Sequence, residues 1–148
     1  MAKTSHELAI EFAVEITELC SKIKGRPEYT KQLIRSASSI SANIAEAKYA
    51  ESNADFVHKL EIAQKEANET ENWLSVLFKS GIIDEFTFKS LRNKCGKIRR
   101  MLIASITTVK AKINGQKWVL SETRNFNLHL FGITYAPCEP RLMRGGAT

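Results

Sequence analysis

The chain has 148 residues, 43% of them hydrophobic and 26% charged, which suffices for one globular domain with its own core and argues against two. The formal net charge is +6, so a polyanion is a more natural partner than a basic surface. No apolar run approaches the roughly eighteen residues of a membrane span, and the N-terminal segment has acidic residues where a signal peptide is apolar, so we expect a cytoplasmic protein without membrane contacts.

Two helices are predicted in the first third of the chain. Thr4 and Glu7 have the spacing of a capping box, and apolar residues then recur at intervals of three and four until Gly25 and Pro27 end the pattern. A second helical pattern covers about residues 28–50, with apolar positions at the same intervals. Each segment is therefore expected to form a helix with one apolar face.

Two further helices are predicted downstream. Ser52 and Asp55 repeat the capping-box spacing and open a helix that reaches to Gly81. Asp84 can cap a fourth helix, whose apolar residues alternate at threes and fours. Long helices joined by short connections predict an all-α fold, an antiparallel up-down four-helix bundle over residues 1–115.

The tail, residues 116–148, differs from the bundle sequence. It lacks a helical period, contains two prolines and three glycines, and has a brief alternation at Phe126, Leu128 and Leu130 that is compatible with a strand. We expect a poorly ordered or accessory tail, either an arm, an extension or a sequence foreign to the domain.

Small side chains are concentrated in the second predicted helix. Residues 36–47, SASSISANIAEA, hold four serines and four alanines, and serine is a mediocre helix former, so the segment indicates close approach of another helix. A stripe that contains small residues lies beside the main apolar face of this second helix. The third predicted helix carries a second apolar patch, which favours an oligomer. Both surfaces are compatible with tight packing inside the monomer or with contact to a second subunit. The stripe on the second helix consists of Ile34, Ser38, Ser41, Ala45 and Tyr49, and the patch on the third helix of Ile62, Trp73 and Val76.

Basic residues are concentrated in the fourth predicted helix. Residues 84–115 hold eight basic side chains against two acidic ones, whereas the first and third helices are net acidic. Projected at about 100° per residue, five cations gather on one side of this helix. They are candidates for binding nucleic-acid phosphates, with a merely solvated face as the alternative. The five are Lys89, Arg92, Arg99, Arg100 and Lys110.

A polar edge is predicted on the second helix. It consists of Arg35, Asn43 and Glu46, and we expect it to fix helix register or to meet a neighbouring subunit. Glu46 is expected to pair with Arg35 or with an arginine of the fourth helix.

Signals for catalysis and for metal binding are weak. His6, His58 and His129 are isolated, and no glycine-rich phosphate loop occurs. The three cysteines are widely spaced and suit neither a disulfide framework nor a zinc site. Glu66 and Glu69 lack the histidine that ferritin-like bundles place three residues after a ligating glutamate. We therefore expect no enzymatic activity, no metal and no cofactor.

The segment IRSASSISANIAEAKYAESNADFVHKLEIAQ resembles the signature of a bacterial family, the four helix bundle proteins or 23S rRNA intervening-sequence proteins. Members show a run close to IRRAAxSIPANIAEG, then a helix beginning KxEFLRFLxIA and an acidic segment ELETQL. Here Ser41 replaces the proline and Ala47 the glycine, and the resemblance covers roughly residues 8–113. Matching positions are Ile34, Arg35, Ala37, Ser39, Ile40, Ala42, Asn43, Ile44, Ala45, Glu46, Phe56, Leu60, Ile62, Ala63, Glu69, Glu71 and Leu74.

The resemblance implies an antiparallel four-helix bundle that assembles into rings, typically homopentamers, and a genetic association with insertions in ribosomal RNA. Related bundles are accessory proteins of the reverse transcriptases of diversity-generating retroelements, where a basic pentamer binds nucleic acid. We therefore expect a non-enzymatic, basic, oligomeric bundle that binds structured RNA, or DNA, through its basic face. Two alternatives are an accessory subunit of such a reverse transcriptase and a small protein-interaction adaptor without nucleic-acid binding.

Overall fold

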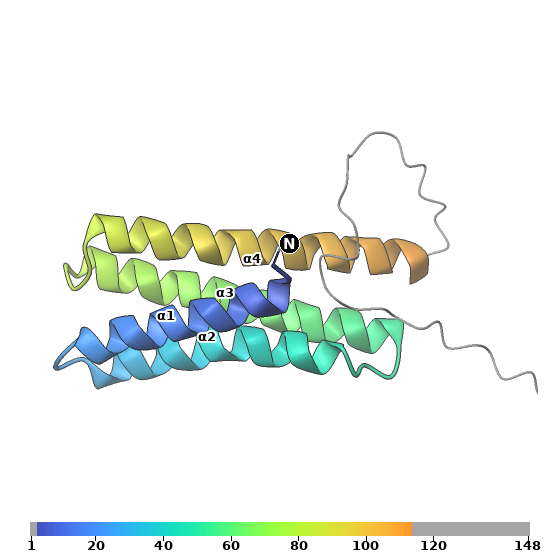
Figure 1. Cartoon of the computed structure of the whole chain (residues 1–148), viewed down its shortest axis with the longest axis horizontal. Coiled ribbons are helices and arrows are strands. Elements are labelled where there is room, and N and C mark those ends of the chain that lie inside the picture. The colour runs from blue at the N-terminus through green and yellow to red at the C-terminus, as the bar shows by residue number, and fades with distance from the viewer. Residues whose placement is uncertain (1–2, 114–148) are drawn as a thin grey trace, which may run out of the picture.

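The computed structural model describes residues 3–113, which form an antiparallel up-and-down bundle of four α-helices (Figure 1). The helices are α1 (Ser5–Lys22), α2 (Pro27–Ala47), α3 (Asn53–Lys79) and α4 (Glu85–Ile113). The predicted all-α fold is confirmed, and residues 3–113 contain no strand. The predicted tail and its possible strand lie outside the described residues.

Side-chain caps open the helices at the predicted places. The Thr4 hydroxyl accepts a hydrogen bond from the Glu7 backbone N–H at 3.1 Å, and the Glu7 carboxylate accepts one from the Thr4 N–H, which completes the capping box. Ser52 caps α3 in the same way through the Asp55 N–H. The Asp55 carboxylate, however, accepts from the N–H of Glu51 rather than of Ser52, so this second box is shifted by one residue.

The end of α2 differs from the prediction. The helical pattern extends to residue 50, but α2 ends at Ala47. The N–H groups of Tyr49 and Ala50 bond the carbonyls of Glu46 and Ala47, so the chain tightens into a turn with three-residue hydrogen bonds. Tyr49 is consequently 87% exposed beside the turn rather than packed on a helix.

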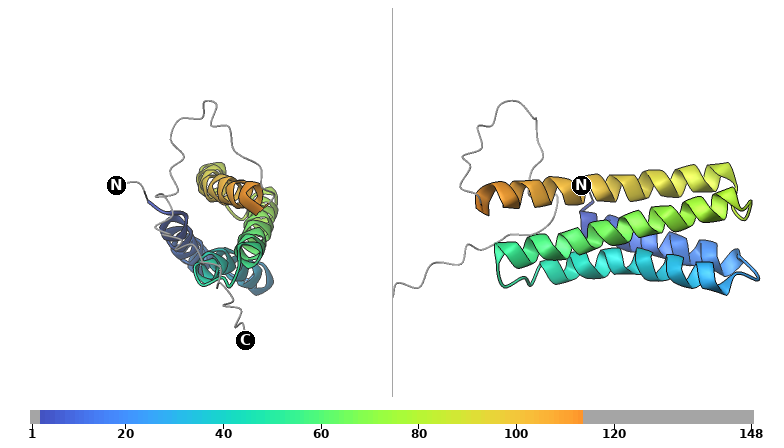
Figure 2. Two further views of the ribbon diagram at one scale, coloured as in Figure 1. Left: turned by 90° about the vertical axis from the view of Figure 1, so that its right-hand side faces the viewer. Right: turned by 180° about the vertical axis from the view of Figure 1, so that it is seen from behind.

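The core lies along the axis of the bundle and receives apolar residues from all four helices. Helix α3 lies between α2 and α4 and packs against both, whereas α1 packs mainly on α2 and only weakly on α4 (Figure 2). No helix among the described residues has the length and apolar character needed to cross a membrane. The largest fully buried apolar side chains are Phe12, Ile16, Leu33, Ile40, Ile44, Leu60, Leu74, Leu77, Ile98 and Leu102.

Helices α2 and α3 meet through small side chains. Ala37 of α2 and Ala63 and Ala67 of α3 have no exposed surface. Ser36 and Thr70 are also fully buried, with their hydroxyl oxygens 2.9 Å apart. Small residues on both helices let the two backbones approach closely, which explains the serine- and alanine-rich segment.

The stripe predicted on α2 does not make this contact. Ser38 is exposed, and Ile34, Ser41 and Ala45 are half-buried at the bundle surface. The Ser41 hydroxyl donates to the carbonyl of Ser38 in the same helix at 3.0 Å. The close contact inside the monomer is thus made by a neighbouring face of α2, and contact of the stripe with a second subunit stays a prediction.

Replacing Ala37 by leucine should lower the free energy of unfolding by about 1 to 3 kcal/mol, because Ala37 is fully buried in the core of the bundle, which has no room for the larger side chain. Urea unfolding followed by circular dichroism measures the change. Ala54→Leu adds the same bulk at an exposed position of α3 and should change stability by less than about 0.5 kcal/mol. Equal stabilities of the two variants would show that the contact is not tightly packed.

Candidate nucleic-acid interface

Four of the five α4 cations that we predicted to bind phosphates form salt bridges with carboxylates. Lys89 Nζ lies 2.7 Å from a carboxylate oxygen of Glu85, one turn earlier in α4. Lys110 Nζ lies 2.7 Å from a carboxylate oxygen of Glu61 in α3. Both pairs are well exposed and contribute little to stability, but each carboxylate balances the charge of one lysine.

Glu71 of α3 binds two arginines of α4 at once. Its Oε1 accepts from Nε of Arg92 and its Oε2 from Nη1 of Arg99, both at 2.8 Å. Arg99 Nη1 also donates to the side-chain oxygen of Asn68 at 2.9 Å. The Glu71 side chain is 17% exposed, whereas that of Arg92 is 58% exposed. One carboxylate therefore orients two guanidinium groups, and we refer to Glu71, Arg92 and Arg99 as the arginine cluster.

The arginine cluster retains unused hydrogen-bond donors. Among the described residues, Arg92 donates only from Nε and Arg99 only from Nη1. A guanidinium has five N–H groups, so both amino groups of Arg92 can donate to a further acceptor such as a phosphate. The Arg92 guanidinium carbon lies 5.9 Å from the ring centre of Phe88, which stacks on Phe78 with ring centres 4.6 Å apart. The Arg92 guanidinium thus packs on the face of the Phe88 ring in a cation–π interaction.

Arg100 is the fifth predicted cation. Within residues 3–113 it forms no salt bridge, and neither does Lys97. A Cβ atom on Gly96 would lie 3.6 Å from Arg100 Nη1, so the arginine folds back along α4 over the glycine. Arg100 therefore adds positive charge to the solvent side of α4 next to the arginine cluster.

Arg35 of the predicted polar edge binds carboxylates of α3. It donates to Glu69, and its Nη1 lies 3.5 Å from a carboxylate oxygen of Glu66. Trp73 Nε1 donates to the same Glu69 at 3.3 Å, and the Trp73 and Tyr29 ring centres are 6.0 Å apart. The hydrogen bond from Arg35 holds the pKa of Glu69 below its usual range. This edge therefore ties α2 to α3.

The other two residues of the edge have partners that were not predicted. Glu46 pairs with Lys59 of α3 at 2.6 Å, so its predicted pairing with Arg35 or with an arginine of α4 is wrong. The α2–α3 turn places Lys59 opposite Glu46, while Arg35 lies three turns away along α2. Asn43 donates to the carbonyl of Ser39 at 2.8 Å within α2.

The second patch predicted on α3 is partly covered. Ile62, Trp73 and Val76 are each half-buried, and Trp73 packs against the edge of the core. Contact of this patch with a second subunit stays a prediction.

Cys20 and Cys95 are both buried. Cys95 has no exposed surface, its thiol donates to the Ala67 carbonyl at 3.3 Å, and burial raises its pKa to about 12. Burial likewise raises the pKa of Cys20 to about 11. Both thiols are protonated at neutral pH and serve as packing residues.

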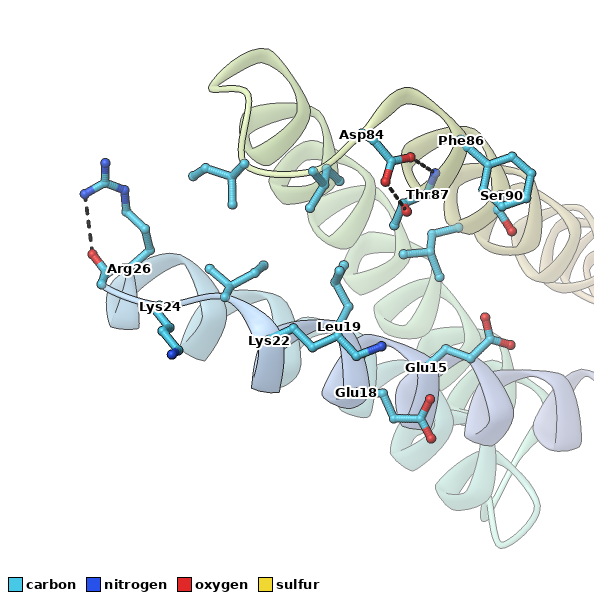
Figure 3. A pocket seen from close by; sticks show the side chains of 15 residues that line it. Glu15, Glu18, Leu19, Lys22, Lys24, Arg26, Asp84, Phe86, Thr87 and Ser90 are labelled. Carbon is cyan, nitrogen blue, oxygen red and sulfur yellow. Dashed lines mark hydrogen bonds between the residues drawn. The ribbon is translucent and has the colours of Figure 1, made fainter.

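The structure contains a cleft that the sequence did not reveal. It encloses about 750 Å³ between the C-terminal end of α1 and the N-terminal end of α4 (Figure 3). Its lining includes three cations, Lys22, Lys24 and Arg26, and Phe86, which is 83% exposed. The walls of the cleft are distant in sequence, and the local sequence signal is Phe86, an aromatic residue two positions after the cap Asp84 that lies off the apolar stripe.

Comparison with known proteins relates the chain to one family. The model of the 23S rRNA-intervening sequence protein family matches residues 4–104, which include the arginine cluster. A solved structure from Bacteroides thetaiotaomicron VPI-5482 shares 40% sequence identity and has a TM-score of 0.66, covering 70% of this chain and 95% of that one. It is described as a protein with unknown function from the S23 ribosomal protein family. No curated protein matches the chain.

Replacing Arg35 by glutamine should raise the pKa of Glu69 toward the ordinary value of about 4.3, because the hydrogen bond from Arg35 is the main cause of its depression. A depressed carboxyl pKa contributes stability above the unfolded-state value and loses it as the pH falls through the folded-state value. The parent should therefore lose more stability than the variant on acidification.

Side-chain carboxyl NMR titration measures the pKa directly. Lys3→Gln, which removes an exposed ion pair on α1, should leave Glu69 unchanged and serves as the control. An identical Glu69 pKa in the parent and in Arg35→Gln would mean that the two side chains do not pair in solution.

Proposed function

The chain belongs to the 23S rRNA-intervening sequence protein family, and from this premise we propose that it binds structured RNA through the phosphate backbone, at the arginine cluster. The observation that carries the proposal is the sharing of Glu71 by Arg92 and Arg99, which leaves one positive charge unbalanced and the amino groups of Arg92 available. The family's description supports ribosomal RNA as the nucleic acid.

The ion pairs reduce the number of predicted α4 cations whose charge is unbalanced. Lys89 and Lys110 are each balanced by their own carboxylate, whereas the arginine cluster has two cations for one carboxylate. Arg100 adds one more charge without a salt bridge in the described part of the chain. The most positive part of this face is therefore the middle of α4 and not its ends.

Arginine suits phosphate better than lysine does. Its planar guanidinium donates two parallel hydrogen bonds to one phosphate, and it is less strongly hydrated than an ammonium group. A carboxylate that fixes the guanidinium beforehand reduces the side-chain entropy that binding would otherwise cost. Contacts of this type recognise the shape of a folded RNA rather than its base sequence.

The proposal includes self-association of the chain. The stripe of α2 and the patch of α3 lie at the surface, and Ser38, Ser41 and Ala45 allow another helix to approach closely. Each added copy repeats the arginine cluster, so several weakly basic subunits together bind a polyanion that one subunit would hold poorly. A ring of five copies is the assembly that the family resemblance led us to expect.

Replacing Arg92 by glutamine should weaken binding to structured RNA and lower the slope of log affinity against log salt by about 0.9 per bound subunit, since one phosphate contact is lost. Arg92 is the best site for this change because Glu71 keeps Arg99 as its partner. Fluorescence anisotropy over a range of salt concentrations measures the slope, and unrelated RNA sequences should respond alike.

Lys48→Gln is the matched control, because it removes an exposed positive charge at the C-terminal end of α2, away from the arginine cluster. Its salt slope should equal that of the parent. If Arg92→Gln also keeps the parental slope and affinity, phosphate binding at this cluster is refuted.

Replacing Ser38 by leucine should lower the mass of the particle in solution, because the added bulk blocks close approach of a second copy. Light scattering after gel filtration should return several times 16.7 kDa for the parent. Ala54→Leu, at an exposed position outside both surfaces, should leave the mass unchanged. A parent that elutes as a clean monomer at micromolar concentration would contradict self-association.

A further inference from the structure

We propose that the cleft between α1 and α4 binds an unpaired RNA nucleotide, with the base stacked on Phe86 and the phosphates bound by Lys22, Lys24 and Arg26. The inference rests on the proposed RNA binding and extends it: the arginine cluster would hold the backbone of a folded RNA, and the cleft would take a single-stranded segment of it.

The turns at this end of the bundle build the cleft. Gly25, between α1 and α2, has φ 71°, and Gly81, between α3 and α4, has φ 69°. Residues with side chains rarely adopt this left-handed conformation, so the two glycines allow the sharp reversals that join α1 to α2 and α3 to α4 at this end of the bundle. A volume of about 750 Å³ falls within the range of sites that bind small organic molecules.

Apolar side chains and one aromatic ring offer a surface for a base. Phe86 is 83% exposed and stands on α4 beside Ser90, at the rim of the cleft (Figure 3). It is not part of the core cluster, so the fold does not account for an aromatic residue at this position. An exposed ring beside cations is the usual platform on which unpaired bases stack. The apolar lining consists of Leu19, Ile23, Ile82, Ile83 and Leu91.

Three cations line the cleft: Lys24 and Arg26 lie at its outer end, and Lys22 extends along α1 toward Leu19 and Glu18 (Figure 3). Lys22, Lys24 and Arg26 form no salt bridge within residues 3–113, in contrast to most cations of α4. The Arg26 guanidinium donates only to the carbonyl of Gly25, at 3.4 Å. These charges are therefore available to phosphate oxygens.

The cleft lining also includes three carboxylates, and two of them already have hydrogen-bond partners. Glu15 and Glu18 lie farther along α1, on the Phe86 side of the cleft (Figure 3), and Glu15 is already paired with Lys94. Asp84 accepts hydrogen bonds from the N–H and the hydroxyl of Thr87, as the cap of α4. Glu18 thus remains as an acceptor for an amino group on the edge of a base. Lys24 and Arg26 on one side and Glu18 on the other thus lie at different ends of the cleft, as do the phosphates and the base amino groups of a nucleotide (Figure 3).

The experiment compares two RNA probes on the full chain. One is a single strand of about ten nucleotides without self-complementarity, and the other is a blunt duplex of about 16 base pairs. Phe86→Leu should weaken binding of the single strand roughly 5- to 100-fold, because an aliphatic side chain replaces the stacking ring, and Phe86→Tyr should restore it. Neither variant should alter duplex binding or thermal stability, since Phe86 is exposed.

The cations are tested by the double variant Lys24→Gln, Arg26→Gln. Its salt slope for the single strand should fall by about 1.4, since each phosphate contact to a single strand contributes about 0.7. Lys48→Gln, at the other end of the bundle, should keep the parental slope.

The outcomes separate the two proposals. A parent that binds the duplex but whose affinity for the single strand is unchanged in Phe86→Leu overturns the cleft proposal alone. Binding of the single strand that depends on Phe86, with no binding of the duplex, supports the cleft and overturns the duplex site. A parent that binds neither probe overturns both. If an oligoglutamate peptide, and not RNA, requires Phe86 for binding, the cleft receives a protein segment and the proposal fails.

Discussion

The packing of α3 between α2 and α4 is the constraint on which the other features depend. Its core face carries Ala63, Ala67 and Thr70, which let α2 approach closely. Its flanks carry carboxylates that reach both neighbours, Glu69 toward Arg35 of α2 and Glu71 toward the arginines of α4. The net negative charge of α3 is thus matched by cations of the helices on either side.

This arrangement redistributes the positive charge of the chain. A helix that is strongly basic in sequence is partly neutralised by the acidic helix beside it, and exposed pairs of this kind contribute little to stability. Where one carboxylate serves two arginines, as at Glu71, positive charge and unused donors remain at the surface. In the turn between α1 and α2, Lys24 and Arg26 likewise form no salt bridge within residues 3–113.

The two proposed RNA surfaces differ in chemistry and in position. The arginine cluster lies on the side of the bundle and offers planar donors suited to the backbone of a helical RNA. The cleft lies at one end and combines Phe86 with cations, which suits unpaired nucleotides. Folded RNAs contain both kinds of element, so in the proposed function one molecule could engage both sites. Self-association would repeat the two sites in a fixed geometry and strengthen binding without new contacts.

The sequence by itself determined the helices, their caps and the family. Thr4, Ser52 and Asp84 cap the predicted helices, since capping and periodicity are local properties that involve residues a few positions apart. Small residues in α2 indicated close packing, but which face packs depended on the orientation of the helix in the bundle. Only the tertiary structure decided that Glu46 pairs with Lys59, that Glu71 joins Arg92 to Arg99, and that Phe86 and Lys22 line the same cleft. These contacts join residues from different helices, and their partners follow from the register and rotation of whole helices, which no local pattern encodes.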